Sequence, residues 1–326
     1  MIETALILAA GLGTRLAPLS AIRAKAALPV VGEAIIRHQV RWLAEAGVRH
    51  VIVNLHHLPA TVTAVLGHGA DLGVSVRYSW EARVLGSAGG PRQAFDLVDD
   101  ERLIVVNGDT ITDLDLPSLL AAHEDQRPLV TMAAAPARPG YNALLVDPAG
   151  AFAGVRPADG PPGPDGAGLE PVHFVGVQIL ERRAVAEVPR GAAAETVKSL
   201  YPGLRSRQPD AVRVWRSEAS FFDVGTPAEY LRTVHALAAR LGRRLDHGAG
   251  THVEATADVT GTVLWDRVHV GAGAVVHDCV IADGVIVPPG ARLARAAVVR
   301  RRDRAPLASD TTLDDLVIVT FDSAAG

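Results

Sequence analysis

The stretch TALILAAGLGTRLAPLSAIRAK, residues 4–25, decides how the first part of this chain folds. It opens with a mostly apolar run, residues 4–10, that predicts a buried strand, and glycines follow at once at positions 11 and 13. Glycines let backbone N–H groups approach a phosphate closely, because they carry no Cβ. Arg15 and Lys25 add two positive charges to the same segment. The stretch therefore predicts a buried strand that leads into an anion-binding loop.

This loop differs from two common phosphate-binding patterns. No Gly-Lys-Ser/Thr follows it, as a Walker loop requires, and Leu16 stands where a dinucleotide fingerprint has its third glycine. Lysine is also scarce, since only Lys25 and Lys198 are lysines among 32 basic residues. A lysine kept against such a bias indicates a position that arginine does not suit, because the two side chains differ in shape and hydration.

Strand-like and helix-like stretches alternate through the first two-thirds of the chain. The expected strands are residues 4–10, 48–54, 74–78, 103–106 and 174–180, and the expected helices are residues 35–46, 59–66, 89–96 and 227–241. This alternation predicts an α/β domain over residues 1–241, with a mainly parallel sheet and helices on both faces. Ligands bind such sheets at the carboxyl ends of strands, so we expect the site in the loops after Ala10 and Val106.

After a predicted linker at residues 242–250, apolar residues recur every six positions. The rows are Val253, Val259, Trp265; Leu264, Val270, Val276; and Val275, Ile281, Val287, Leu293, Val299. Such hexapeptide repeats are typical of a parallel β-helix, in which each coil has three short faces and the apolar residue points inward. We expect a short left-handed β-helix over residues 251–302, with about three coils of about 18 residues each. A run of β-hairpins is the alternative. For the tail, residues 303–326, edge pairing and partial disorder both stay open.

The composition limits the class of protein. The chain has 326 residues, of which 48% are hydrophobic and 21% charged, and this is typical of a soluble globular protein. A net charge of −4 argues against a nucleic-acid binder. Cys279 is the only cysteine, so an intramolecular disulfide is excluded and we expect a cytoplasmic protein. The apolar run at residues 5–10 is too short for a signal peptide or a membrane span. A Pro/Gly-rich stretch at residues 158–168 predicts an exposed loop.

Residues 11–25 resemble the signature of the sugar-1-phosphate nucleotidyltransferases, Gly-x-Gly-Thr-Arg followed about nine residues later by Lys. The family usually has Pro on both sides of this Lys, where the present chain has Ala24 and Ala26. Three further segments resemble the family's motifs in the same order, at residues 85–90, 107–109 and 222–227. Many members also carry a C-terminal β-helix. The resemblance spans residues 2–302 and implies a Rossmann-like nucleotidyltransferase domain, followed by that helix.

The resemblance implies an enzyme that transfers a nucleotidyl group from a nucleoside triphosphate to a sugar 1-phosphate and releases pyrophosphate. It assigns catalysis to Arg15, Lys25, Asp109 and Asp223. Asp109 and Asp223 are hard oxygen ligands suited to Mg²⁺, the expected cofactor. Arg15 is expected to hold the β- and γ-phosphates with its planar fork, and Lys25 to lie between the two phosphates that react. The expected nucleotide site also includes Leu8, Ala9, Ala10, Gly11, Gly13, Thr14, Gly86, Ser87, Ala88, Asn107 and Gly108.

The sugar-phosphate side departs further from the family's pattern. Where the family has Glu-Lys-Pro, this chain has Val-Arg-Pro, so Arg156 stands in place of the lysine. A Tyr-Gly pair that lines the sugar in the family corresponds to Tyr141 and Asn142, and residues 174–177 resemble a further sugar-side strand. We therefore expect Asn142, Arg156 and Gly176 to bind the sugar phosphate. The pair at 56 and 57, both His, is expected to border the site rather than to bind a metal.

Two other classes of protein fit part of the pattern. A non-catalytic regulatory subunit that senses nucleotide sugars would share the loops, but it should have lost the charged catalytic positions that this chain keeps. An acyltransferase built on a β-helix would need more coils and no glycine-rich nucleotide loop.

The substrate of the expected enzyme stays open among several family members. The two-domain layout resembles mannose-1-phosphate guanylyltransferases, whereas residues 53–58 and 86–90 resemble N-acetylmuramate-1-phosphate uridylyltransferases, which lack the β-helix. Glucose-1-phosphate nucleotidyltransferases are a further alternative. We expect GTP and mannose 1-phosphate, because Asn142 offers a donor and an acceptor to hexose hydroxyls and takes room from a bulkier sugar. We also expect the flat sides of the β-helix to mediate a homo-oligomer, with no nucleic-acid or membrane partner.

Overall fold

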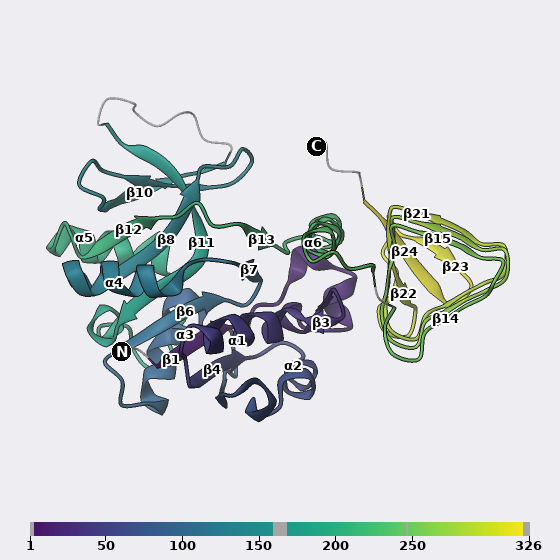
Figure 1. Cartoon of the computed structure of the whole chain (residues 1–326), viewed down its shortest axis with the longest axis horizontal. Helices are drawn as coiled ribbons and strands as arrows, with labels where there is room; N and C mark the ends of the chain where they lie inside the picture. Colours follow the sequence, from purple (N-terminus) through teal and green to yellow (C-terminus); the bar gives the residue numbers. More distant parts are fainter. Residues whose placement is uncertain (1–2, 159–167, 246, 322–326) are drawn as a thin grey trace. The chain divides into compact units, whose positions relative to one another are not determined.

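The computed structural model describes residues 3–158, 168–245 and 247–321 (Figure 1). The chain divides into two compact units. The first consists of Met1–Gly11, Gln39–His57 and Leu66–Phe221, and the second of Leu12–His38, Leu58–Val65 and Phe222–Gly326. The second unit thus joins the signature segment to the hexapeptide region, although more than 200 residues separate them in the sequence. Most of the predicted loop at 158–168 lies outside the described residues, as does the end of the predicted tail. No helix in the described ranges is long and apolar enough to cross a membrane.

A nine-stranded sheet forms the centre of the first unit. Seven strands follow the order β10-β9-β11-β6-β1-β4-β5, and the other two branch from it, since β8 pairs with β11 and β12 pairs with β8. The strands are β1 (Thr4–Leu8), β4 (His50–Leu55), β5 (Ser75–Trp80), β6 (Arg102–Asn107), β8 (Val130–Pro136), β9 (Ala143–Val146), β10 (Phe152–Arg156), β11 (Glu170–Glu181) and β12 (Val212–Arg216). The block β6-β1-β4-β5 is parallel, as predicted. Strand β11 runs antiparallel to β6, β8 and β9, so the sheet is mixed and parallel pairs do not dominate it.

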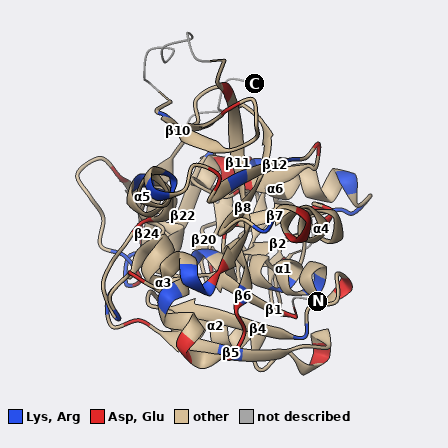
Figure 2. Cartoon of the chain, turned by 90° about the vertical axis from the view of Figure 1, so that its left-hand side faces the viewer, with Lys and Arg blue, Asp and Glu red and all other residues tan. Residues whose placement is uncertain are grey.

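Helices cover this sheet and complete its core. They are α1 (Ile35–Glu45), whose first residues, up to His38, belong to the second unit, α3 (Gly86–Ala94), α4 (Leu116–Gln126) and α5 (Tyr201–Arg207). Helix α3 packs on β1 and β4, α4 on β8, and α5 on β10 and β12. Buried apolar residues such as Leu6, Ile52 and Val105 meet beneath them. Figure 2 shows basic residues on α3 and α5 and acidic residues on α4, so charges of both signs are interspersed over the first unit.

Helix α3 begins three residues earlier than predicted, at Gly86, and ends at Ala94 instead of continuing to Asp96. The glycine-rich segment is therefore the first turn of a helix rather than a loop before it. The backbone N–H groups of Ala88 and Gly89 both donate to the Ala194 carbonyl, at 2.9 and 3.3 Å. A Cβ on Gly89 would lie 2.4 Å from the Ala192 carbonyl oxygen, so glycine is needed for this approach.

The hexapeptide region consists of stacked coils of short parallel strands (Figure 1). One ladder contains β14 (His252–Val253), β17 (His269–Val270) and β20 (Ile286–Val287), the next β15 (Asp258–Thr260), β18 (Val275–His277) and β21 (Arg292–Ala294), and the third β16 (Val263–Leu264), β19 (Val280–Ile281) and β22 (Ala296–Arg300). The strands within each ladder run parallel, as predicted, and the β-hairpin alternative is wrong for these coils.

The coils are one residue shorter than predicted. His252 pairs with His269, which pairs with Ile286, so each coil has 17 residues rather than 18. One face of each coil is therefore a residue short, and the interior row runs through Leu264, Ile281 and Val298. The predicted rows were wrong to place Trp265, Val275 and Val299 in that interior, because a strict six-residue period ignores the short face.

The segment after the last coil pairs with it. Strand β24 (Leu316–Thr320) runs antiparallel to β22, and β23 (Thr311–Leu313) pairs with β24. The edge-pairing prediction for the tail is therefore correct for these strands, and the pairing covers an open edge of the coil. The remaining elements of the second unit include two helices, α2 (Pro59–Leu66, whose last residue belongs to the first unit) and α6 (Pro227–Arg240). Its other short strands are β2 (Pro29–Val30), β3 (Glu33–Ala34) and β13 (Phe221–Asp223, whose first residue belongs to the first unit), and its 3-10 turns are η1 (Thr14–Leu16), η2 (Leu19–Ala21) and η3 (Lys25–Ala27).

Candidate functional site

In the first unit, the loops after β1 and β6 lie side by side. Leu8 and Asn107, the last residues of the two strands, are register partners. The Gly108 backbone N–H donates to the Leu8 carbonyl at 2.9 Å, and a Cβ on Gly108 would lie only 2.5 Å from that oxygen. Gly108 is therefore fixed by a close backbone approach. The arrangement brings the predicted Leu8–Gly11 and Asn107–Asp109 segments together at the carboxyl ends of parallel strands, where ligands bind in such sheets.

A buried glutamine holds the turn that carries Asp109. The Gln39 side chain, 2% exposed, donates from Nε2 to the carbonyls of Asn107 at 2.7 Å and Thr110 at 2.8 Å. Gly176 packs on the same turn, since a Cβ there would lie 2.3 Å from Thr110 Oγ1. Close packing against Thr110 therefore explains why position 176 is a glycine. Gln39 is not among the predicted site residues, although a polar residue on the apolar face of a predicted helix was a readable signal.

A second buried network joins three segments of the first unit. The Ala9 backbone N–H donates to Asn54 Oδ1 at 2.7 Å, and Asn54 Nδ2 donates to Glu81 Oε1 at 2.7 Å. Glu81 Oε2 accepts from the Leu85 backbone N–H at 2.8 Å. Asn54 is 3% and Glu81 5% exposed, so the bonds are shielded from water. These two residues, absent from our predicted site, fix the backbone at Ala9 relative to the start of the second glycine-rich segment.

Ser87 is also held by the chain. Its Oγ donates to Glu195 Oε2 at 2.9 Å and accepts from the Thr196 backbone N–H at 2.9 Å. The N–H groups of Ala88 and Gly89 are used as well, so these backbone donors and the Ser87 hydroxyl bond within the chain.

In the second unit, the predicted charged residues gather from distant parts of the sequence. Lys25 Nζ lies 3.9 Å from Asp223 Oδ1, with 18% and 25% of the two side chains exposed. A Cβ on Gly225 would lie 3.4 Å from both terminal nitrogens of Arg15. Gly13 adopts the left-handed conformation (φ 61°), and a Cβ there would lie 3.9 Å from Lys25 Cβ. Two cations and a carboxylate are therefore grouped and reachable by solvent, as an anionic, metal-bearing ligand requires.

The alanine in place of the family's proline has a local explanation. The Ala24 backbone N–H donates to Thr61 Oγ1 at 3.0 Å, a bond that proline cannot make because it lacks the N–H. Ala24 and Ala26 are both buried, at 0% and 2% exposure. A hydrogen bond from Ala24 thus helps to fix the segment that carries Lys25.

Other predicted residues lie at the rim of the first unit. Asn142 is exposed, and its Oδ1 accepts from the Ala158 backbone N–H at 2.9 Å. Arg156 ends β10 and is half-buried. His56 Nδ1 bonds to the Glu81 carbonyl at 2.9 Å. Over the described ranges, no group of three or more His, Cys, Asp and Glu side chains forms a metal site by itself.

Comparisons with known proteins identify the family of this chain. The Nucleotidyl transferase family model matches residues 4–141, and the GlmU-like C-terminal hexapeptide model matches residues 247–304. The N-acetylmuramate alpha-1-phosphate uridylyltransferase of Neisseria meningitidis is 33% identical over 247 residues, covering 72% of this chain and 97% of that protein. This chain belongs to the sugar-1-phosphate nucleotidyltransferases.

Two further similarities, one in sequence and one in structure, also extend over most of the chain. The mannose-1-phosphate guanylyltransferase of Mycobacterium tuberculosis is 26% identical over 306 residues, covering 89% of this chain and 83% of that protein. The crystal structure of HddC from Yersinia pseudotuberculosis shares the fold, with a TM-score of 0.61 and 20% identity over 72% of this chain and 100% of that chain. The predicted family, reaction class and hexapeptide repeat are confirmed.

Proposed function

We propose that this nucleotidyltransferase uses GTP and mannose 1-phosphate as substrates and forms a nucleotide sugar with release of pyrophosphate. The observation that carries the proposal is the grouping of Arg15, Lys25 and Asp223 in the second unit. The relative named mannose-1-phosphate guanylyltransferase supports the choice of substrate, because its similarity extends over 89% of this chain.

The protein's contribution to the reaction is positioning and charge. A sugar-phosphate oxygen attacks the α-phosphorus in line, and the bond to pyrophosphate breaks. Such a step needs orientation and neutralisation of phosphate charge rather than covalent help. Arg15 takes the leaving phosphates with its fork, and Lys25 places a compact charge beside the reacting phosphates. In this proposal the nucleotide lies along Leu8–Gly11, Gly13 and Thr14, with Ser87 and Asn107 at its base and ribose.

Magnesium is the proposed cofactor, and the donor set fits it. Asp109 and Asp223 offer carboxylate oxygens, which are the ligands that Mg²⁺ prefers, and the Asp223 side chain is 25% exposed. When bound, the ion would neutralise negative charge on the triphosphate. Lys25 Nζ lies 3.9 Å from Asp223 Oδ1, so a positive charge already stands beside this proposed ligand.

For the sugar phosphate we propose Asn142, Arg156 and Gly176. The Oδ1 of Asn142 already accepts the Ala158 N–H, so we assign the sugar contact to its NH₂ group. Arg156 offers a planar fork to the phosphate of the sugar. Gly176 contributes space and backbone rather than a side chain.

The hexapeptide region raises three further proposals. We propose that its coils wind with a left hand, that they mediate a homo-oligomer, and that residues 1–241 and 251–302 act as separate domains joined at 242–250. The support for the homo-oligomer is an exposed apolar side chain on the side of the coil, Ile286, which is 65% exposed.

A second candidate pair is N-acetylmuramate 1-phosphate with UTP. It is favoured by the 33% identity to the uridylyltransferase of Neisseria meningitidis, but that match covers only 72% of this chain. Glucose 1-phosphate is a third sugar, as the uridylyltransferase of Synechocystis matches 90% of the chain at 23% identity.

A substrate matrix tests the proposal. Pyrophosphate release is measured for the four common nucleoside triphosphates against mannose, glucose, N-acetylglucosamine, N-acetylmuramate and heptose 1-phosphates, with and without Mg²⁺. We expect the highest kcat/KM for GTP with mannose 1-phosphate. Any pair that is more than tenfold better rejects the substrate assignment, and tight nucleotide-sugar binding without turnover favours a sensing subunit.

A further inference from the structure

The coils contact the signature segment through an unusual pair of acidic residues. Asp266 and Asp283 occupy the same corner of successive coils, because the coil repeat is 17 residues. At this corner the coil before has Ala249 and the coil after has Arg300. Two carboxylates stacked in the turns of neighbouring coils repel each other unless a cation lies between them. This corner of the coil is therefore built to receive a positive charge from elsewhere in the chain.

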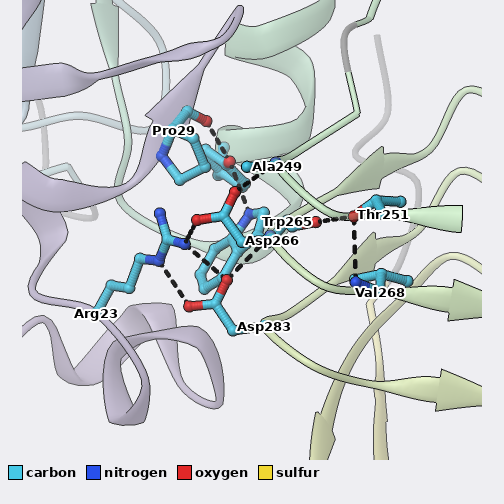
Figure 3. Close-up of polar contacts among 9 residues, drawn as sticks. Arg23, Pro29, Ala249, Thr251, Trp265, Asp266, Val268 and Asp283 are labelled. Carbon is cyan, nitrogen blue, oxygen red and sulfur yellow. Dashed lines mark hydrogen bonds and ion pairs between the residues drawn. The ribbon is translucent and has the colours of Figure 1, made fainter.

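Arg23 supplies that charge (Figure 3). Its Nε donates to Asp283 Oδ2 at 2.8 Å, and its Nη2 donates to Asp283 Oδ1 at 2.6 Å and to Asp266 Oδ2 at 2.6 Å. The guanidinium also lies over the ring of Trp265, 5.2 Å from its centre. Only 15% of the Arg23 side chain is exposed, so the bonds are weakly screened by water. Bidentate pairing of this kind fixes direction as well as distance.

The two aspartates are themselves held in place. The Asp266 backbone N–H donates to Asp283 Oδ1 at 3.1 Å, and Asp266 Oδ1 accepts from the Ala249 backbone N–H at 2.8 Å. The partner of Arg23 is thus the rigid corner of three successive coils rather than one mobile side chain.

A second link joins the coil to the segments that carry Lys25 and Asp223. Trp265, 1% exposed, donates from Nε1 to the Tyr230 hydroxyl at 3.1 Å, and that hydroxyl donates to the Pro29 carbonyl. Tyr230 lies on α6, the helix that begins four residues after Asp223, and Thr233 of the same helix donates to the Asp223 carbonyl at 3.3 Å. Pro29 begins β2, four residues after Lys25.

We propose that Arg23, through its ion pairs with Asp266 and Asp283, is a positioning residue for Lys25, so that the hexapeptide coils take part in phosphate binding as well as in any assembly. Arg23 precedes Lys25 by two residues, and Lys25 is the first residue of the short turn η3. This inference rests on the proposed role of Lys25. It departs from a purely assembly-related role for the coils, which the sequence pattern alone predicts.

The test uses full-length protein and substitutions on either side of the contact. Arg23→Met and Asp283→Asn should lower kcat about tenfold while the KM for the nucleoside triphosphate changes less than about threefold, because Lys25 acts more in the transition state than in the ground state. Arg23→Lys, which keeps the charge without the fork, should recover part of the loss. Asp258→Asn is the matched control, since Asp258 lies on the same coils but bonds to Thr260 and His277. It should leave kcat unchanged.

A double-mutant cycle separates positioning from general stability. In a Lys25→Ala background, Arg23→Met should cost less than about twofold further, because its effect passes through Lys25. Full multiplication of the two losses overturns the proposal, and so does an Asp258→Asn protein that is as slow as Asp283→Asn.

Hydrogen exchange tests the proposal without measuring activity, and it can also be applied to a variant of lowered stability. In Asp283→Asn, the amides of residues 14–28 should exchange at least about tenfold faster than in Asp258→Asn at equal global stability. Equal exchange in the two variants overturns the proposal. If the wild-type enzyme turns over no substrate pair, the proposed function fails, while the exchange experiment still decides whether the coils order this segment.

Discussion

Asp109 and Lys25 are both predicted site residues, yet the chain holds them in different ways. The Asp109 turn follows a central strand, and the register of β1 with β6 and the Gln39 side chain fix its backbone. The Lys25 turn belongs to no large sheet, and its surroundings include Thr61, Asp223 and, through Arg23, the hexapeptide coils. A site residue on a strand end is positioned by backbone pairing, whereas one on an irregular segment depends on side chains that are remote in sequence. The two kinds of support should respond differently to mutation.

The largest effect is expected at Lys25 itself. Lys25→Ala should lower kcat at least ~10²-fold with the fold intact, as for the loss of one preorganised electrostatic contact. Lys25→Arg should also fail, because a planar fork does not replace a compact ammonium. Steady-state kinetics with a circular-dichroism melt measures both. A variant within tenfold of the wild type removes Lys25 from the mechanism.

Asp109 in the first unit and Asp223 in the second are the two proposed metal ligands, so equivalent substitutions can be compared. Asp109→Asn and Asp223→Asn should each lower kcat/KM by roughly 30- to 100-fold and raise the Mg²⁺ concentration needed for half-maximal rate, because each replaces an anionic metal ligand by a neutral one. A magnesium titration of each variant provides the measurement. If a chelator leaves the wild-type rate unchanged, the metal assignment of both residues is wrong.

A smaller effect is expected in the buried network of the first unit. Glu81→Gln places an amide NH₂ against one of two donors, Asn54 Nδ2 or the Leu85 N–H, and should destabilise the protein by about 1–3 kcal/mol. Since the same network holds the Ala9 backbone, kcat/KM should fall by about tenfold. Urea unfolding and kinetics are compared with exposed Glu218→Gln. A Glu81→Gln protein as stable and active as that control contradicts a positioning role.

The smallest effect concerns acid stability at His173. Burial, and then the charge of Arg138, lower the pKa of His173 to about 4, and its ring stacks on Phe221 with 4.8 Å between centres. The neutral form is favoured in the folded state, so the stability that it contributes is complete above the ordinary pKa of about 6.5 and is lost as the pH falls towards 4.

The comparison for this prediction is between two histidine variants. In His173→Gln, the free energy of unfolding should decline less between pH 7 and pH 4 than in the wild type, by about 1 kcal/mol after allowance for partial exposure. Exposed His68→Gln is the control, and identical pH profiles for the two variants would show that His173 does not titrate in this range.

Local patterns in the sequence were sufficient for much of the fold. Three patterns predict their structure from neighbouring residues alone. They are the apolar run before Gly11, the helical spacing of residues 35–46 and 59–66, and the hexapeptide rows. The order of the charged motifs and the family they belong to were readable for the same reason. Strand β8 was missed because its alanines favour helix, and the neighbouring strands of the sheet override that preference.

Tertiary structure decided what depends on residues far apart in the chain. The 17-residue coil was not visible in a six-residue period, because the short face appears only when strands pair. Asn54 and Glu81 lie 27 residues apart, and Arg23 and Asp283 lie 260 apart. No local sequence pattern predicts such bonds, because the sequence alone does not distinguish a carboxylate that becomes buried from one that stays exposed. The sequence by itself determined which groups are expected to bind phosphate, and only the folded chain decided what holds them in position.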